Sequence, residues 1–395
     1  MDLFDKCKNY KVVDVAIEKG IYPYFHALET KQDTEVVMEG INQIMLGSNN
    51  YLGLTIHPDV IEAGKEAILK YGSGCSGSRF LNGNTRLHLE LEAELAEFLH
   101  KDGCVTFGTG FQTNLGIISC IAGRNDYIIS DKENHASIYD GCRLSYAKLV
   151  RYNHSDMEDL ERQLKSIPEE AGKLIVTDGV FSMGGDICKL PEIVALAKKY
   201  GARVMVDDAH ALGVIGEGGR GTASHFGLEK EVDIIMGTFS KSLAALGGYM
   251  AASAEVCKFV RHNSRPFIFA ASITPTSVQC ARKALQILKA EPERVTRLKE
   301  VADYARAKLR EKHVDINDSE APIIPINTYD DEITFIACKK LFENGVYVNP
   351  VISPAVPVGH SIIRTSYMAT LTNEQIDRAV DIIAKVMDEL NLLKK

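Results

Sequence analysis

From Cys104 onward, short apolar segments alternate with helical segments, and this alternation constrains the fold more than any other feature of the sequence. Strand-like segments at 104–107, 127–130, 174–177 and 203–207 are each followed by an amphipathic or apolar helical pattern. Such alternation predicts an α/β architecture with a mainly parallel sheet and crossover helices. Ligands of parallel sheets bind outside the carboxyl ends of the strands, so we expect the functional residues there.

One strand end presents a lysine. The apolar run 232–236 predicts a buried strand, and Gly237-Thr238-Phe239-Ser240-Lys241-Ser242-Leu243 follows it. A lysine placed among hydroxyl groups suits imine formation with an aldehyde, and pyridoxal phosphate (PLP) is the commonest such aldehyde. The hydroxyls and free backbone N–H groups of the turn would hold its phosphate. An ordinary exposed loop lysine is the alternative, and this segment alone does not decide between them.

A second strand end carries acidic groups and a histidine. The apolar run 203–206 leads into Asp207-Asp208-Ala209-His210. PLP chemistry needs an anion beside the pyridine nitrogen, because the protonated ring is the electron sink. Asp207 fits that role, and His210 can reach the ring oxygen O3′. A capped helix start is the simpler alternative, but the spacing of 31–34 residues to Lys241 fits one crossover and one strand.

These two segments resemble the motifs of the α-oxoamine synthase family of PLP-dependent acyltransferases. The resemblance extends over nearly the whole chain, from about Tyr22. The resemblance implies a fold-type I PLP-dependent transferase, with a mainly parallel seven-stranded sheet in a large domain and a small C-terminal α+β domain. The expected division is an N-terminal helix and arm at 1–45, a PLP-binding domain at 46–288 and the small domain at 289–395.

The resemblance also implies roles for individual residues. Lys241, His135, Asp207 and His210 are the expected catalytic residues, with Lys241 holding PLP and His135 stacking on the ring. Further cofactor contacts are implied for Gly110, Phe111, Ser182, Thr238, Ser240 and Ser272. Ser272 corresponds to a segment lent to the partner subunit, which implies a homodimer with a shared site.

Substrate contacts are implied for Asn50, Tyr51 and Arg364. Arg364 lies in an apolar strand pattern at 361–366, where an arginine needs a partner, and its planar fork matches a carboxylate. An internal ion pair is the alternative. Two positions depart from the family pattern: Ile352 stands where some serine palmitoyltransferases carry an arginine, and Leu371 replaces a usual histidine.

Two segments resemble the serine palmitoyltransferase branch of bacteria in particular, namely residues 72–83 and Tyr22-Pro23-Tyr24-Phe25. That branch condenses L-serine with palmitoyl-CoA, with loss of CO2 and CoA, to give 3-ketosphinganine, the first step of sphingolipid synthesis. A 2-amino-3-ketobutyrate CoA ligase or an 8-amino-7-oxononanoate synthase stays open, and so, more remotely, does a non-catalytic binding protein of this fold. The acyl length and the choice of CoA or carrier protein also stay open.

Composition excludes several other classes. The net charge of −8 and the lack of a basic run argue against nucleic-acid binding. The nine cysteines form no C-x-x-C pair and no metal-like cluster with histidine, which favours reduced thiols in a cytoplasmic protein and no metal site. Residues 1–20 lack the apolar core of a signal peptide, and no apolar stretch is long enough to span a bilayer. A peripheral membrane contact for a lipid product stays open.

Several local features are also predicted. We expect one helix at 4–19, a strand at 266–270, and capping boxes at Ser155–Glu158 and Thr372–Gln375. Two G-x-G-x-x-G spacings begin at Gly72 and Gly216. Neither lies directly between a strand and a helix, so we reject both as dinucleotide sites.

Overall fold

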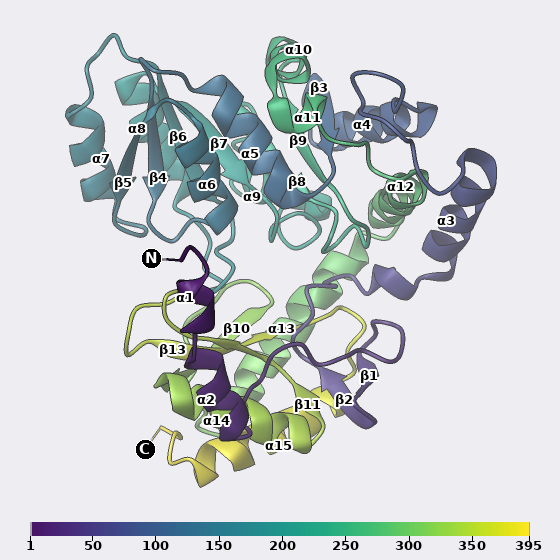
Figure 1. Ribbon diagram of the computed structural model, residues 1–395, viewed down its shortest axis with the longest axis vertical. Helices are drawn as coiled ribbons and strands as arrows, with labels where there is room; N and C mark the ends of the chain where they lie inside the picture. Colours follow the sequence, from purple (N-terminus) through teal and green to yellow (C-terminus); the bar gives the residue numbers. More distant parts are fainter. Residues whose placement is uncertain (1, 395) are drawn as a thin grey trace.

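The larger of two bodies in the computed structural model, which describes residues 2–394, is built on one seven-stranded sheet (Figure 1). Only β9 runs against its neighbours, and the other pairings are parallel, which confirms the predicted fold class. In sheet order the strands are β3 (Gly103–Phe107), β9 (Gly248–Ala252), β8 (Ile234–Thr238), β7 (Arg203–Asp207), β6 (Lys173–Asp178), β4 (Tyr127–Asp131) and β5 (Lys148–Tyr152).

Helices cover both faces of this sheet, because successive strand residues point to opposite sides and both sides are apolar. Ile129, Ile175 and Val204 belong to one core, and their neighbours Ile128 and Leu174 belong to the other. The first core includes α3 (Pro58–Tyr71), α4 (Arg86–Phe98), α7 (Met157–Lys165), α8 (Leu190–Tyr200) and α12 (Pro275–Ala290). The second includes α5 (Gly110–Ile121), α6 (Ala136–Leu144), α10 (Ala254–Asn263) and α11 (Arg265–Ile268).

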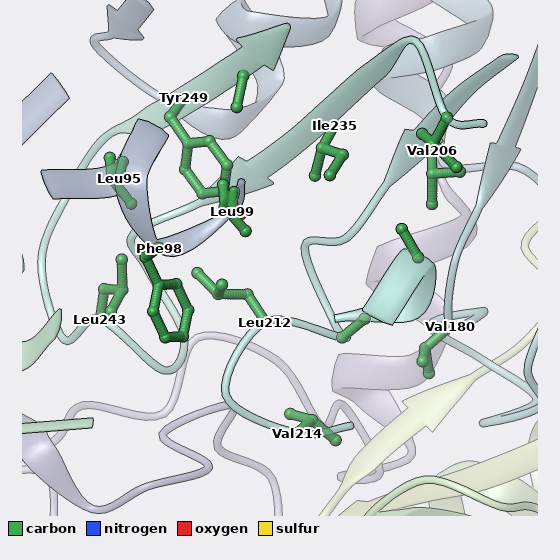
Figure 2. Packing of buried hydrophobic residues seen from close by; sticks show 14 of the residues in the cluster. Leu95, Phe98, Leu99, Val180, Val206, Leu212, Val214, Ile235, Leu243 and Tyr249 are labelled. Carbon is green, nitrogen blue, oxygen red and sulfur yellow. The ribbon is translucent and has the colours of Figure 1, made fainter. Parts of the chain in front are cut away.

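In the first core, side chains of the sheet pack against side chains of the loops that follow β7 and β8. Figure 2 shows Leu95 of α4 and Leu99, which directly follows α4, beside Tyr249 of β9, with Leu212 and Leu243 from the loops after β7 and β8 close by. A side chain at Gly237 would place its Cβ 2.4 Å from the Tyr249 ring, so glycine is required at this point of β8. The loops that carry His210 and Lys241 are therefore anchored on a packed core.

The smaller body lies below the first in Figure 1, with α13 (Glu293–Glu311) running between them. One three-stranded sheet has the order β10 (Ile323–Tyr329), β13 (Ser361–Ser366), β12 (Asn349–Val351). Another has the order β1 (Glu35–Met38), β2 (Ile41–Met45), β11 (Val346–Tyr347), so residues near the N-terminus complete a sheet of the C-terminal region. Helices α14 (Asp331–Glu343) and α15 (Asn373–Glu389) pack on these sheets.

Two local predictions of secondary structure are wrong. The helix expected at 4–19 is two short helices, α1 (Asp5–Lys8) and α2 (Val12–Glu18), because the Tyr10 amide bonds Cys7 O and the regular ladder stops. The segment expected as a strand at 266–270 lies mostly in α11, with proline in the first helical turn. Proline is favoured there, and a short apolar run does not by itself distinguish a strand from a helix.

Of the two predicted capping boxes, only one is present. Thr372 and Gln375 exchange the two hydrogen bonds of the motif at the start of α15, as predicted. The box expected at Ser155–Glu158 is wrong, because the cap is Asp156, whose carboxylate accepts from the Asp159 amide at 2.9 Å. Across residues 2–394, no helix has both the length and the apolar character needed to cross a membrane.

Candidate active site

A cavity of about 210 Å³ lies at the carboxyl ends of β7 and β8, as expected for a parallel sheet. The N-terminus of α5 and the loop before α6 form further walls of this cavity. Most of the residues predicted to bind or work with the cofactor line this one cavity: Gly110, Phe111, His135, Asp207, His210, Thr238, Ser240 and Lys241. The crossover topology thus brings together residues separated by more than one hundred positions in the sequence.

Lys241 follows β8 and lines the cavity. Loss of hydration there, helped by the nearby positive charge of Arg364, lowers the pKa of Lys241 to about 7, although Asp207 and Asp178 act in the opposite direction. Near neutral pH a large fraction of this amine is therefore unprotonated. An unprotonated amine is the form that attacks an aldehyde carbon, so Lys241 is suited to covalent catalysis.

Asp207 is a buried carboxylate at the end of β7. Asn114 of α5 donates to its Oδ2 at 2.7 Å, and the Ala209 amide donates to its Oδ1 at 2.9 Å. Among residues 2–394, no basic side chain forms a salt bridge with it. An oriented buried anion of this kind suits a protonated ring nitrogen in the cavity.

His135 caps the N-terminus of α6 and forms a wall of the cavity. Its Nδ1 lies 2.7 Å from the Ser137 hydroxyl, and its backbone amide donates to Asp178 at 3.1 Å. Burial lowers the pKa of His135, with the positive charge of Lys241 adding to the effect. The imidazole is therefore neutral at physiological pH, which suits stacking on an aromatic ring.

His210 and Tyr51 form a buried pair, with 2.7 Å between Nδ1 and the phenol oxygen. Burial lowers the pKa of His210 well below its usual value and raises the pKa of Tyr51, so both side chains are neutral. Tyr51 contacts the site through His210 and does not itself line the cavity. The neighbouring Asn50 is also buried, and its Nδ2 has no hydrogen-bond partner in the described part of the chain.

Arg364 lies buried in β13 and reaches across to the large domain. Its Nε donates to the carbonyl oxygen of Ser182 at 2.6 Å, and its terminal nitrogens bond Asn49 Oδ1 at 3.0 Å and Ser366 Oγ at 3.3 Å. No carboxylate of residues 2–394 forms a salt bridge with this guanidinium, so the internal ion pair considered from the sequence is not observed. The guanidinium is held by neutral oxygens, which leaves its charge available for a carboxylate.

The start of α5 has the features of a phosphate site. Thr109 caps the helix by accepting from the Gln112 amide at 3.0 Å, and the Gly110 and Phe111 amides have no preceding turn to bond. A Cβ on Gly110 would lie 2.8 Å from the Thr238 side chain, so glycine allows β8 to approach the helix. The Thr238 and Ser240 hydroxyls lie 3.0 Å apart at the same place. Amides, hydroxyls and the helix dipole together favour a bound phosphate.

Two predicted cofactor residues lie outside this cavity. Ser182 contributes its carbonyl oxygen to Arg364, and its side chain lines a neighbouring cavity. Ser272 donates its amide to Gly77 at 2.9 Å, beside the loop at 72–83, and its buried hydroxyl has no partner among the described residues. Neither residue lines the cavity of Lys241 within this one subunit, so the cofactor roles of Ser182 and Ser272 stay predictions.

Several site residues were not predicted. Asn114 orients Asp207, Ser137 contacts His135, and Asn49 holds Arg364. Asp178 also lines the cavity, and burial together with the Asp207 charge raises its pKa well above the usual value. Asn114 follows Gly110 by one helical turn, and that spacing is the signal by which it could have been found.

The family model for class I and II aminotransferases matches residues 41–383, and the chain therefore belongs to this family, in its branch of α-oxoamine synthases. It is 52% identical over 390 residues to the serine palmitoyltransferase of Sphingobacterium spiritivorum, covering 99% of this chain and 98% of the relative. It is 44% identical to the 8-amino-7-oxononanoate synthase of Thermoanaerobacter pseudethanolicus, covering 95% of each. A solved serine palmitoyltransferase with PLP has a TM-score of 0.97 and 38% identity and covers both chains completely.

Proposed function

We propose that this chain is a PLP-dependent serine palmitoyltransferase, which condenses L-serine with palmitoyl-CoA to give 3-ketosphinganine, CoA and CO2. The observation that carries the proposal is full-length sequence identity of 52% to a serine palmitoyltransferase, in a chain whose Lys241, Asp207 and His135 line one cavity. This would be the first step of sphingolipid synthesis. Other α-oxoamine synthases share the cavity chemistry, so the choice of substrates rests on the similarity.

The residues of the cavity fit PLP. The phosphate would lie at the N-terminus of α5, against the Thr238 and Ser240 hydroxyls. The ring nitrogen would face Asp207, which Asn114 orients, and His135 would cover one ring face. When bound, PLP supplies an electron sink that stabilises negative charge on the α-carbon of an amino acid. His210 would reach the ring oxygen, held in place by Tyr51.

The chain's own residues would then bind the serine and move its proton. Lys241 would hold the cofactor, and its free amine would accept the proton from the serine Cα, because burial lowers its pKa to about 7 and lets it act as a base. Arg364 binds the carboxylate with two nitrogens of its fork, after exchanging its bond to Asn49. His135 orients that carboxylate from the ring face.

The condensation balances when one proton is taken from solvent, because the serine Cα releases one proton whereas the CoA sulfur and the product carbon each take one up. The serine Cα forms a bond to the thioester carbonyl carbon, and the CoA sulfur leaves with the bonding pair and takes up a proton. The carboxylate then leaves as CO2, and its bonding electrons return to Cα, which is protonated. A dry cavity favours both steps, because charge developing near Lys241 and Arg364 is screened less than in water.

The proposal includes assembly and location. A homodimer with a shared site is supported by the large exposed apolar side chains Phe80 and Leu81, in the loop at 72–83, and Phe269, shortly before Ser272. A cytoplasmic location is supported by nine cysteines that are all free thiols. A peripheral membrane contact would let the lipid product leave.

A panel of substrates tests the proposed function. CO2 release is measured for serine, glycine and alanine, each with acetyl-, pimeloyl- and palmitoyl-CoA. Serine with palmitoyl-CoA should be fastest, because a site that bonds the serine hydroxyl rejects analogues that lack it. Fastest turnover of alanine with pimeloyl-CoA would instead indicate an 8-amino-7-oxononanoate synthase, the alternative favoured by the 44% identity to such an enzyme.

A further inference from the structure

We propose that an apolar cavity between the N-terminal arm and the small domain holds the acyl chain of the thioester substrate. The cavity has a volume of about 410 Å³. None of the described side chains that line it is charged. The inference deepens the proposed function and depends on it only for the identity of the acyl donor, because the cavity is defined by residues outside the cofactor site.

The N-terminal arm forms one wall. Val13 and Ala16 of α2 line the cavity, and so do Tyr22 and Tyr24 of the segment that follows. Figure 1 shows α2 beside α14, and Lys19 binds Glu332 of α14 at 2.7 Å. This ion pair connects the arm to the small domain.

Aromatic rings of the arm and of α14 contact one another along this wall of the cavity. The rings of Tyr22 and Tyr24 meet edge to face with centroids 5.5 Å apart, and Tyr24 meets Phe335 of α14 in the same manner at 5.7 Å. Partial burial raises the pKa of Tyr24, whose side chain is still 37% exposed. Edge-to-face aromatic rings offer broad apolar surfaces that suit methylene groups.

The opposite wall comes from the end of β12 and the loop after it. Val351 and Ile352 line the cavity, and Val351 is buried. Ile352 is the position at which the sequence departs from relatives that carry an arginine. An arginine would bring a charge into this wall, whereas isoleucine keeps it apolar.

The cavity adjoins the candidate active site through residues that line two cavities at once. Met183 and residues 353–355 line both the apolar cavity and a larger one of about 860 Å³. The larger cavity shares His135 with the cavity of Lys241. Met183 also follows Ser182, whose carbonyl holds Arg364. A thioester reacting beside Lys241 would therefore extend its chain past Met183 toward Tyr22 and Tyr24.

This placement predicts how affinity changes with chain length. Each methylene buried in an apolar cavity contributes about 0.8 kcal/mol, which is about fourfold in affinity. Affinity should rise with each carbon until the cavity is full. Bulk added to the wall should end that rise at a shorter chain and leave short chains unaffected.

The experiment uses the holoenzyme and S-alkyl-CoA thioethers of 6, 10 and 16 carbons, which bind without reacting. Calorimetry gives each affinity for the unmodified protein, for Ala16→Phe and for a control, Ile17→Phe. Ile17 is exposed on the same helix and does not line the cavity. We expect Ala16→Phe to weaken the 16-carbon ligand at least tenfold and the 6-carbon ligand less than twofold. Ile17→Phe should match the unmodified protein.

A second variant keeps the test valid if Ala16→Phe fails to fold. Val351→Phe fills the cavity from the other wall and should shift the length profile in the same direction. Retained binding of serine, read from the cofactor's visible spectrum, shows that each variant is folded. If both variants bind all three thioethers like the unmodified protein, the acyl chain lies elsewhere, even if 3-ketosphinganine is produced. If the unmodified protein fails to use serine with palmitoyl-CoA, the proposed function is wrong, and the titrations still test the cavity.

Discussion

At the scale of single residues, the candidate site depends on charges that are buried but not paired with one another. Asp207 is held by amides, and Arg364 is held by carbonyl and hydroxyl oxygens. A direct ion pair between such groups would neutralise both, whereas neutral partners keep each charge available to a ligand. The site is therefore arranged for a ligand with a cationic ring and an anionic carboxylate.

Lys241 is the first residue to test. Lys241→Ala should abolish the covalent link to PLP, because no other lysine lines the cavity within residues 2–394. The measurement is labelling with borotritide after incubation with PLP, followed by peptide mapping. The unmodified protein should carry the label on Lys241 and the variant should carry none. Label on a different lysine of the variant would show that the assignment is wrong.

Arg364 is the second residue to test. Hydrogen bonds to charged groups contribute about 1.5–3 kcal/mol, so Arg364→Ala should weaken serine binding about 10- to 100-fold. Arg364→Lys keeps the charge but loses the fork, and we expect an intermediate affinity. Serine titration of the cofactor's visible spectrum measures both, with PLP affinity as the control. An unchanged serine affinity in the alanine variant would exclude this role.

At the scale of elements, a buried ionic network fixes the loop at 72–83. Glu92 of α4 binds Arg79 of this loop at 2.8 Å and Arg261 of α10 at 2.9 Å. It also accepts from the Thr106 amide of β3 at 2.9 Å. Arg79 belongs to the segment that indicates the serine palmitoyltransferase branch. The structure shows that its guanidinium holds the loop to the sheet edge.

This network should matter for stability. Glu92→Gln removes the charge that two arginines share and should lower the free energy of unfolding by about 3–5 kcal/mol, as for other broken buried pairs. The control is Glu97→Gln on the same helix, where an exposed carboxylate faces Lys289 at 3.2 Å. That change should cost less than about 1 kcal/mol. Denaturant unfolding of the holoenzyme measures both, and equal effects would contradict the expectation.

His154 links two loops that border the site. Its Nδ1 lies 3.1 Å from Asp131 at the end of β4, its Nε2 lies 3.1 Å from Asp186, and Glu133 is 3.7 Å away. Although burial opposes protonation, the hydrogen bonds to Asp131 and Asp186 raise the pKa of His154 to about 10. The folded protein therefore keeps this histidine charged at pH values where the unfolded chain does not.

The sign of the pH effect follows from that raised pKa. The stabilisation from His154 should be complete below about pH 6.5, the usual value for histidine, and should be lost as the pH rises to about 10. His154→Gln should remove this part of the pH dependence, whereas the exposed His262→Gln should not. Unfolding free energies at pH 6, 8 and 10 test this. Parallel curves for the protein and His154→Gln would disprove the assignment.

The sequence predicted the site best where strand order alone determines position. Asp207 ends β7 and Lys241 closely follows β8, its parallel neighbour, so both had to lie at one edge of the sheet. Asn49 was missed, because its role comes from a loop whose path depends on tertiary packing. Asp178 was also missed, although it ends β6 beside Asp207 and the same argument of strand ends applies to it. The strand expected at 266–270 failed for a local reason, since five apolar or small residues fit a helical turn equally well.

At the scale of the whole molecule, large exposed apolar side chains near Ser272 mark where the proposed second subunit would bind. Leu81 and Phe269 are 76% and 74% exposed, and the Ser272 amide bonds Gly77 in the loop that carries Leu81. Leu81→Asp should shift a homodimer toward monomer and weaken PLP binding, if Ser272 serves the partner's cofactor. Tyr146→Asp, 72% exposed near the opposite edge of the sheet, is the control. Sedimentation measures both, and a monomeric unmodified protein would refute the dimer.

The pairing of β2 with β11 has a consequence for how the protein is made. Residues 35–45 leave the ribosome early, but β11 begins only at Val346, about 300 residues later. At about 5–20 residues per second, the early hairpin waits roughly 15–60 s for its third strand. During that delay Val36, Met38 and Ile44, which are buried in the finished protein, face water. A nascent-chain chaperone would find its binding segment here, well before the large sheet is complete.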